Sequence, residues 1–138
     1  MRDKQAKSFI VIIIAIALCA LLLKVAIENI IKINITQNES TAQATLKLIS
    51  TALENFAKDN KGAFPTGLAV LTQATPPYLD KDYIDNFPLK GYNYNCSRLD
   101  ALGYSCSAIP AKCNLTGKTS FTISTGNLFI SEECDKKE

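Results

Sequence analysis

The sequence contains no histidine and no tryptophan, and only five of its 138 residues are proline and six glycine. Histidine is the commonest general base in enzymes and the commonest ligand of transition metals. Its absence argues against a histidine-dependent hydrolase and against a histidine-ligated metal site. Fifteen basic and thirteen acidic residues leave a net charge of +2, which gives no strong field for binding nucleic acid. We therefore predict no nucleic-acid partner and no cofactor.

Proline and glycine are also unevenly distributed, because neither occurs between Ser8 and Asn60. Apolar residues recur there at helical spacing, and residues 9–23 carry no charge. These features predict one helix of about 50 residues. It is expected to end at residues 60–62, where the sequence Asn-Lys-Gly provides a C-terminal stop. A break near Thr36–Ser40 is the alternative, because those residues have modest helix propensity.

The first part of this helix is predicted to cross a membrane. The uncharged run Phe9–Leu23 approaches the length of about 20 residues that a spanning helix needs. Three basic residues, Arg2, Lys4 and Lys7, precede it and place the N-terminus in the cytoplasm, with the bulk of the chain outside. A cleaved signal peptide is the alternative. Because no Ala-x-Ala motif directly follows the apolar run, where a cleavage site would lie, we expect a retained anchor.

Beyond Leu23 the helix stays largely apolar as far as Ile35, and its charged residues there are Lys24, Glu28 and Lys32. Spaced four apart, these three lie on one narrow stripe and can pair with one another along the helix. A helix that is apolar around most of its circumference outside lipid is expected to pack against other proteins. A tilted span that buries more of the segment, with Lys24 reaching the interface, is the alternative.

The remaining residues, 36–138, predict an extracytoplasmic globular head. The helix is amphipathic here, and Leu46, Ile49, Leu53 and Phe56 share one face. Residues 63–90 are loop-like, and alternating patterns then predict strands at 92–96, 104–108, 120–124 and 128–130. The predicted fold class is α+β, in which the C-terminal half of a long membrane-spanning helix packs on a small three- or four-stranded antiparallel sheet.

Four of the five cysteines, Cys96, Cys106, Cys113 and Cys134, lie in the predicted head. An even number outside the cytoplasm indicates disulfides, and four cysteines allow three pairings. We favour Cys96–Cys106 across the first hairpin and Cys113–Cys134 closing the C-terminal segment. A zinc site is the alternative, but no C-x₂-C element is present. Cys19 is expected to be a small residue on the membrane helix.

Two sets of residues are candidates for binding or catalysis. Five tyrosines are candidate contacts of a binding module, although we expect most of them to pack inside the head. Two carboxylate clusters are candidates for acid–base chemistry or Ca²⁺, but neither contains an EF-hand-like ligand loop, so we expect solvated loop charges and predict no enzyme. The tyrosines are Tyr78, Tyr83, Tyr92, Tyr94 and Tyr104, and the clusters are Asp80, Asp82 and Asp85, and Glu132, Glu133 and Asp135.

The order of these features resembles the type IV pilin and type II secretion pseudopilin superfamily over nearly the whole chain. The shared order is a short basic leader, an apolar helix that opens with Ser8-Phe9, a long amphipathic continuation and a small sheet with disulfides. The segments that carry the resemblance are Asn38–Ala42, Leu46–Ile49, Phe56–Asn60, Phe64–Thr66, Pro76–Leu79, Gly91–Tyr94, Gly103-Tyr104 and Ala108–Pro110.

The resemblance implies a structural subunit of a pilus-like or pseudopilus filament. Residues 1–8 would be a cytoplasmic leader, 9–35 the membrane and filament-core half of the helix, and 36–138 the head. Partners would be copies of the chain or related pilins, the inner-membrane assembly platform and the membrane itself. The chain would reside in the inner membrane or in a surface filament. Helix packing would involve Phe9, Ile13, Ile30, Ile31 and Ile35. A membrane-tethered binding module that does not polymerise is the alternative.

In this family a peptidase cleaves the leader and methylates the new N-terminus, so Ser8 and Phe9 would form the processing site. The family usually has Gly before the cleaved bond and Glu at the fifth mature position, whereas Ser8 and Ile13 stand there in this chain. A register that puts cleavage after Ala6 places Val11 at the Glu position. The resemblance therefore implies a minor or divergent subunit.

Overall fold

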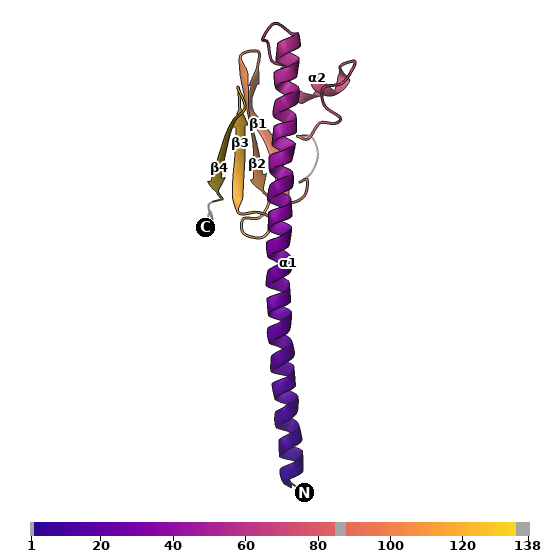
Figure 1. Cartoon of the computed structure of the whole chain (residues 1–138), viewed down its shortest axis with the longest axis vertical. Coiled ribbons are helices and arrows are strands. Elements are labelled where there is room, and N and C mark those ends of the chain that lie inside the picture. Colours follow the sequence, from indigo (N-terminus) through magenta and orange to yellow (C-terminus); the bar gives the residue numbers. More distant parts are fainter. Residues whose placement is uncertain (1, 85–87, 135–138) are drawn as a thin grey trace. The chain divides into compact units, whose positions relative to one another are not determined.

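The computed structural model describes residues 2–84 and 88–134, with side chains from residue 7 onward. The chain divides into two compact units, which we call the helical unit, up to Ile33, and the head unit, from Asn34 onward. Figure 1 labels the elements. They are α1 (Arg2–Asp59), α2 (Leu68–Gln73), β1 (Tyr92–Asp100), β2 (Gly103–Pro110), β3 (Thr119–Ser124) and β4 (Leu128–Glu133).

The long helix α1 is continuous over 58 residues, so the predicted single helix is confirmed and the break near Thr36–Ser40 is absent. Its C-terminus lies where the Asn-Lys-Gly stop predicted it. Lys61 and Gly62 adopt positive φ angles of 56° and 87°, and the amide of Gly62 donates to the carbonyl of Ala57 at 2.7 Å. The left-handed turn thus satisfies one of the last carbonyls of the helix, which have no partner within it.

The sheet is an antiparallel meander with strand order β1-β2-β3-β4. All four predicted strands are present, and β1 and β4 are longer than expected, since they continue to Asp100 and Glu133. A register shift between Cys96 and Arg98 marks an irregularity in β1, after which the pairing with β2 resumes. Cys96 lies opposite Cys106 in this register, and the two form a disulfide.

The head unit has one hydrophobic core between the sheet and the part of α1 that belongs to this unit. The helix contributes the predicted face, with Leu46, Ile49 and Leu53 buried and Phe56 packed at its margin. Strand β3 contributes Phe121 and Ile123, alternate residues that point to the same side of the sheet. Helix and sheet thus form the predicted α+β arrangement.

The loop between α1 and β1 contributes to this core through the short helix α2. Its residues Leu68 and Leu71 are buried, three positions apart on one face. In the view of Figure 1 the sheet lies on one side of α1 and α2 on the other. Leu68 and Leu71 belong to the same core cluster as the buried face of α1 in the head unit.

Candidate functional site

The helical unit presents a continuous apolar surface. Apart from Ile31, its large hydrophobic residues from Phe9 to Ile33 are each at least half exposed, at every angle around the helix. No residue in the most apolar 18-residue window of α1 is buried, and the helix is long and apolar enough to cross a membrane. The exposed large hydrophobic residues are Phe9, Ile10, Val11, Ile12, Ile13, Ile14, Ile16, Leu18, Leu21, Leu22, Leu23, Val25, Ile27, Ile30 and Ile33.

The predicted helix-packing residues do not all lie on this surface. Phe9, Ile13 and Ile30 are 65%, 50% and 57% exposed, whereas Ile31 is partly buried. Ile35 is only 5% exposed and lies in the head unit. Its own chain already covers it, so Ile35 is not available to other subunits as predicted. The boundary between the two units accordingly falls after Ile33 rather than after Ile35.

The charged residues of this surface, Lys24, Glu28 and Lys32, are all exposed along α1. Because successive residues turn by 100°, the three occupy an arc of about 80° on one side of the helix, with about 6 Å between neighbours along the axis. We call this set the charged stripe. Glu28 is the only acidic residue between Asp3 and Glu39. Ser8 and Phe9, the predicted processing pair, are also exposed and helical.

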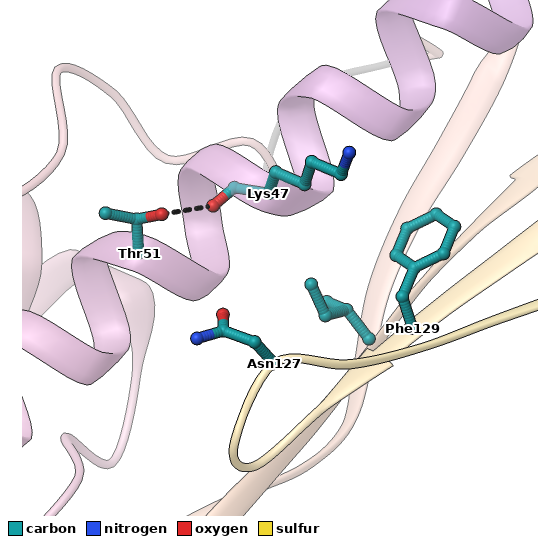
Figure 2. A pocket seen from close by; sticks show the side chains of 5 residues that line it. Lys47, Thr51, Asn127 and Phe129 are labelled. Carbon is teal, nitrogen blue, oxygen red and sulfur yellow. Dashed lines mark hydrogen bonds between the residues drawn. The ribbon is translucent and has the colours of Figure 1, made fainter.

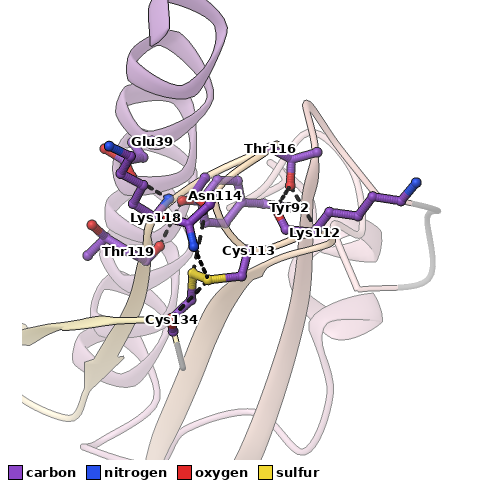
Figure 3. The surroundings of a disulfide bond; sticks show 10 residues. Glu39, Tyr92, Lys112, Cys113, Asn114, Thr116, Lys118, Thr119 and Cys134 are labelled. Atoms are coloured by element: carbon purple, nitrogen blue, oxygen red, sulfur yellow. Dashed lines mark hydrogen bonds between the residues drawn. A yellow bond between two sulfur atoms is a disulfide. The ribbon is translucent and has the colours of Figure 1, made fainter. Parts of the chain in front are cut away.

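In the head unit, the segment 111–118 is held by a disulfide and by the helix (Figure 3). Cys113 is bonded to Cys134, which closes the segment onto the end of β4. Asn38 of α1 donates to the carbonyl of Thr116 at 2.9 Å, and Glu39 accepts from the amide of Lys118 at 2.8 Å. The two disulfides have the pairing that the sequence favoured, and Cys19 is the free, exposed cysteine.

A shallow groove of about 290 Å³ lies between α1 and the β3–β4 hairpin (Figure 2). Lys47 and Thr51 approach it from the helix, and Asn127 and Phe129 from the hairpin. The ammonium of Lys47 lies 5.8 Å from the centre of the Phe129 ring, a cation–π distance. The groove combines one cation, one amide and an apolar floor.

Polar contacts beside this groove attach the hairpin to the helix. The hydroxyl of Ser50 lies 2.7 Å from that of Tyr104 and also donates to the side chain of Asn127. Glu54 accepts from the Tyr104 hydroxyl at 2.9 Å and from the amide of Gly126 at 2.8 Å. Sequence analysis missed this network. Ser50 and Glu54 are spaced i, i+4 on the helix, but nothing in the sequence indicates which strand residue they meet.

Four of the five candidate tyrosines are buried, at 8%, 0%, 8% and 1% exposure for Tyr83, Tyr92, Tyr94 and Tyr104. Tyr78 is partly buried and packs edge-to-face on Phe56 at 5.5 Å. The expectation that most of them pack inside the head is confirmed, and they do not form a binding surface. Burial raises the pKa values of Tyr92 and Tyr104 to about 12.

The candidate carboxylates are used in local structure or exposed. Asp80 accepts from the Tyr83 hydroxyl at 2.9 Å, and Asp82 accepts from the amide of Ile84 at 2.9 Å. Glu132 and Glu133 are exposed beside a hydroxyl-lined hollow on the outer face of the sheet. Asp85 and Asp135 lie outside the described residues. Within residues 2–84 and 88–134, no group of three or more acidic, cysteine or histidine side chains is arranged to hold a metal ion.

Comparisons with protein-family models, with curated proteins and with solved structures give no match to this chain. The features of this chain that point to a function are the apolar surface of α1, the charged stripe and the disulfide-bonded head unit.

Proposed function

We propose that the chain is a structural subunit of a filament of the type IV pilus or type II secretion pseudopilus kind. Its helical unit anchors it in the inner membrane before assembly and packs against the helices of neighbouring subunits in the filament. The head is extracytoplasmic, and the basic N-terminal segment is cytoplasmic. The inner-membrane assembly platform of such a system is the partner expected for a subunit of this kind.

The observation that carries the proposal is the length of the exposed apolar surface. Exposed large hydrophobic residues begin at Phe9 and continue through Val25 and Ile27 to Ile30 and Ile33. At 1.5 Å per residue, Phe9 to Ile33 measures about 36 Å, more than the ~30 Å hydrocarbon core of a bilayer. The part of the helix that extends beyond the hydrocarbon core carries exposed isoleucines. Soluble proteins rarely leave a contiguous apolar patch of this kind exposed to water. Helices of other subunits would cover them.

A second set of observations fits the same role. The head unit is a small domain cross-linked by two disulfides, Cys96–Cys106 and Cys113–Cys134, as suits an oxidising compartment. Among the described residues, neither the groove at Lys47 nor the hollow beside Glu132 contains a catalytic arrangement. An exposed apolar helix joined to a disulfide-bonded head unit supports a structural role.

The proposal is tested by photo-crosslinking in native membranes, with a photoreactive amino acid at position 30. Filament assembly predicts covalent adducts with a second copy or with a related subunit, identified by mass spectrometry. A photoreactive residue at Ile109, which is 49% exposed on the head unit, serves as the matched control. Exclusive recovery of monomers from position 30 would contradict the proposal.

A polar variant separates a filament subunit from a tethered binding module. Replacing Val25, Ile27 and Ile33 together by Gln, with the photoreactive residue kept at position 30, is expected to abolish adducts and filaments while the head unit keeps its melting temperature. The control replaces Leu48, Ile109 and Leu128, exposed apolar residues of the head unit, in the same way. A tethered binder would tolerate both sets of substitutions. Unchanged assembly of the first variant would therefore favour the tethered module.

Processing is tested by the intact mass of the protein purified from its own cells. Cleavage between Ser8 and Phe9 followed by methylation predicts a chain that begins at a methylated Phe9. Cleavage after Ala6 predicts a chain that begins at Lys7. The unprocessed mass would indicate a retained leader, which is compatible with a divergent subunit but not with the peptidase step.

A further inference from the structure

The charged stripe contains the only charged residues of the exposed apolar surface between Phe9 and Ile33. Its order along α1 is positive, negative, positive, at Lys24, Glu28 and Lys32. When apolar helices associate, charges between them lose water and must lie opposite charges of the other sign. The stripe therefore restricts how two copies of this helix can be placed side by side.

Two parallel copies with facing stripes can be compared at each axial offset. Without an offset, Lys24, Glu28 and Lys32 each lie opposite the same residue of the other copy, and all three pairs repel. An offset of four residues places Glu28 opposite the neighbour's Lys24, and Lys32 opposite the neighbour's Glu28, so both pairs attract. An offset of eight residues leaves one repulsive pair of lysines. Copies inserted through the same membrane are parallel, so antiparallel arrangements do not arise.

We propose that the charged stripe sets an axial offset of four residues, about 6 Å, between neighbouring copies of this chain. This inference rests on the proposed filament function and specifies its packing. A contact with an axial offset is not symmetric between the two partners. Where the stripes of successive copies all face one common axis, this asymmetric contact repeats and continues as an open filament rather than closing on itself. The stripe would thus favour polymerisation over a closed, in-register bundle.

Lys24, Glu28 and Lys32 can also pair with one another within one helix. Variants with reversed charges distinguish pairing within a helix from pairing between copies. Glu28→Lys makes the stripe uniformly positive, and Lys24→Glu with Lys32→Glu makes it uniformly negative. Neither variant has an attractive pair within a helix, and copies of the same variant repel one another. Each alone is expected to lose photo-adducts from position 30, whereas co-expression of the two restores mixed adducts. Failure of the mixture to restore them, with both variants present in the membrane, overturns the proposal.

The offset itself is measured with cysteines on the same arc. Leu21 and Val25 are 62% and 56% exposed, and at 100° per residue they lie within about 60° of Glu28. In a Cys19→Ser background, copies with L21C are co-expressed with copies with V25C and oxidised. A disulfide requires Cα atoms within about 7 Å, so the offset predicts mixed 21–25 dimers in excess of 21–21 and 25–25 dimers.

The failure of this inference is distinguishable from failure of the proposed function. Predominant 21–21 and 25–25 dimers would show copies in register, which overturns the offset while the association stands. If positions 21 and 25 give no dimers and position 30 gives no photo-adducts, both the axial offset and the proposed filament function are overturned. A control in which Lys24, Glu28 and Lys32 are all Gln, carrying the same two cysteines, is expected to lose the preference for mixed dimers.

Discussion

Single side chains decide how firmly the sheet is attached to α1. Tyr104 is 1% exposed, and its hydroxyl contacts both Ser50 and Glu54 of the helix. Tyr78 offers a comparison, because its hydroxyl donates to Asp59 at 2.7 Å on the surface. The two tyrosines make similar bonds in different surroundings, so they separate the effect of burial from that of the bond itself.

Tyr104→Phe is expected to lower the free energy of unfolding of the head unit by about 1–2 kcal/mol, because buried polar partners lose a hydrogen bond. Tyr78→Phe is expected to change it by less than about 0.5 kcal/mol, as is usual for surface substitutions. Chemical unfolding of the full chain in mild detergent, followed by near-ultraviolet circular dichroism, measures both. Equal effects of the two substitutions would contradict the role assigned to the buried network.

Alkaline pH is expected to unfold the head unit through the same tyrosines. Burial is the largest cause that raises the pKa values of Tyr92 and Tyr104 from 10.0 to about 12, and the nearby carboxylates of Glu39 and Glu54 add to it. A pKa raised by folding means that the neutral phenol stabilises the fold. This contribution is complete below pH 10 and is lost as the pH rises toward 12.

Parallel titrations of phenolate absorbance and circular dichroism measure this effect. We expect ionisation of the buried tyrosines to coincide with loss of tertiary structure, and the loss to be shallower in Tyr104→Phe. Ionisation of Tyr92 and Tyr104 near pH 10 in a head that stays folded would contradict the prediction.

At the scale of elements, the connection between β2 and β3 depends on the absence of one side chain. A Cβ atom at Gly117 would lie 2.1 Å from the hydroxyl oxygen of Tyr92, which donates to the carbonyl of Thr119 at 2.7 Å. Gly67 has open space around its Cβ position and an extended backbone, with φ of −171°. A side chain would therefore clash with Tyr92 at Gly117 but would meet no neighbouring atoms at Gly67.

Gly117→Ala is expected to destabilise the head unit by about 1–3 kcal/mol, the usual cost of overpacking, because the Tyr92 ring must move. Gly67→Ala is expected to be neutral or slightly stabilising, since alanine restricts the unfolded chain. Thermal melts of both variants in the same detergent compare them. A melting temperature of Gly117→Ala equal to that of the unsubstituted chain would show that the Tyr92 site accommodates the extra carbon.

The elements that the sequence predicted correctly are those with local causes. The helix follows from a run without proline or glycine, its end from Lys61 and Gly62, and the strands from alternation. The Cys96–Cys106 pair follows from the hairpin that connects its strands. Contacts distant in sequence were not predictable. The bonds of Asn38 and Glu39 to segment 111–118 bring together residues nearly 80 positions apart.

The same distinction explains the errors. Ile35 looks like its apolar neighbours in the sequence, and only the long-range fold of the head unit buries it. The candidate site was more predictable, because an apolar helix over residues 9–33 predicts the exposure that most of its large residues have in the helical unit. The partners of this surface were not predictable, because the sequence determines the composition of a surface but does not identify the surface that packs against it.

At the scale of the whole chain, the two units differ in what they need in order to be stable. The buried hydrophobic residues of the described chain begin at Ile35, and the core cluster begins at Ala42. Removing residues 1–33 therefore takes away no core residue and neither disulfide. A chain of residues 34–138 is expected to be a soluble monomer whose melting temperature equals that of the full chain's head unit in detergent.

Size-exclusion chromatography with light scattering and thermal melts measure these properties. A chain of residues 46–138 is the control, because it loses Ile35, Ala42 and the bonds of Asn38 and Glu39 to segment 111–118. Deleting buried apolar side chains costs several kcal/mol, so this shorter chain is expected to melt well below the first or not to fold. Aggregation of residues 34–138 would mean that the head unit needs the helical unit. The apolar surface would then stabilise the fold itself, rather than serve membrane anchoring and assembly alone.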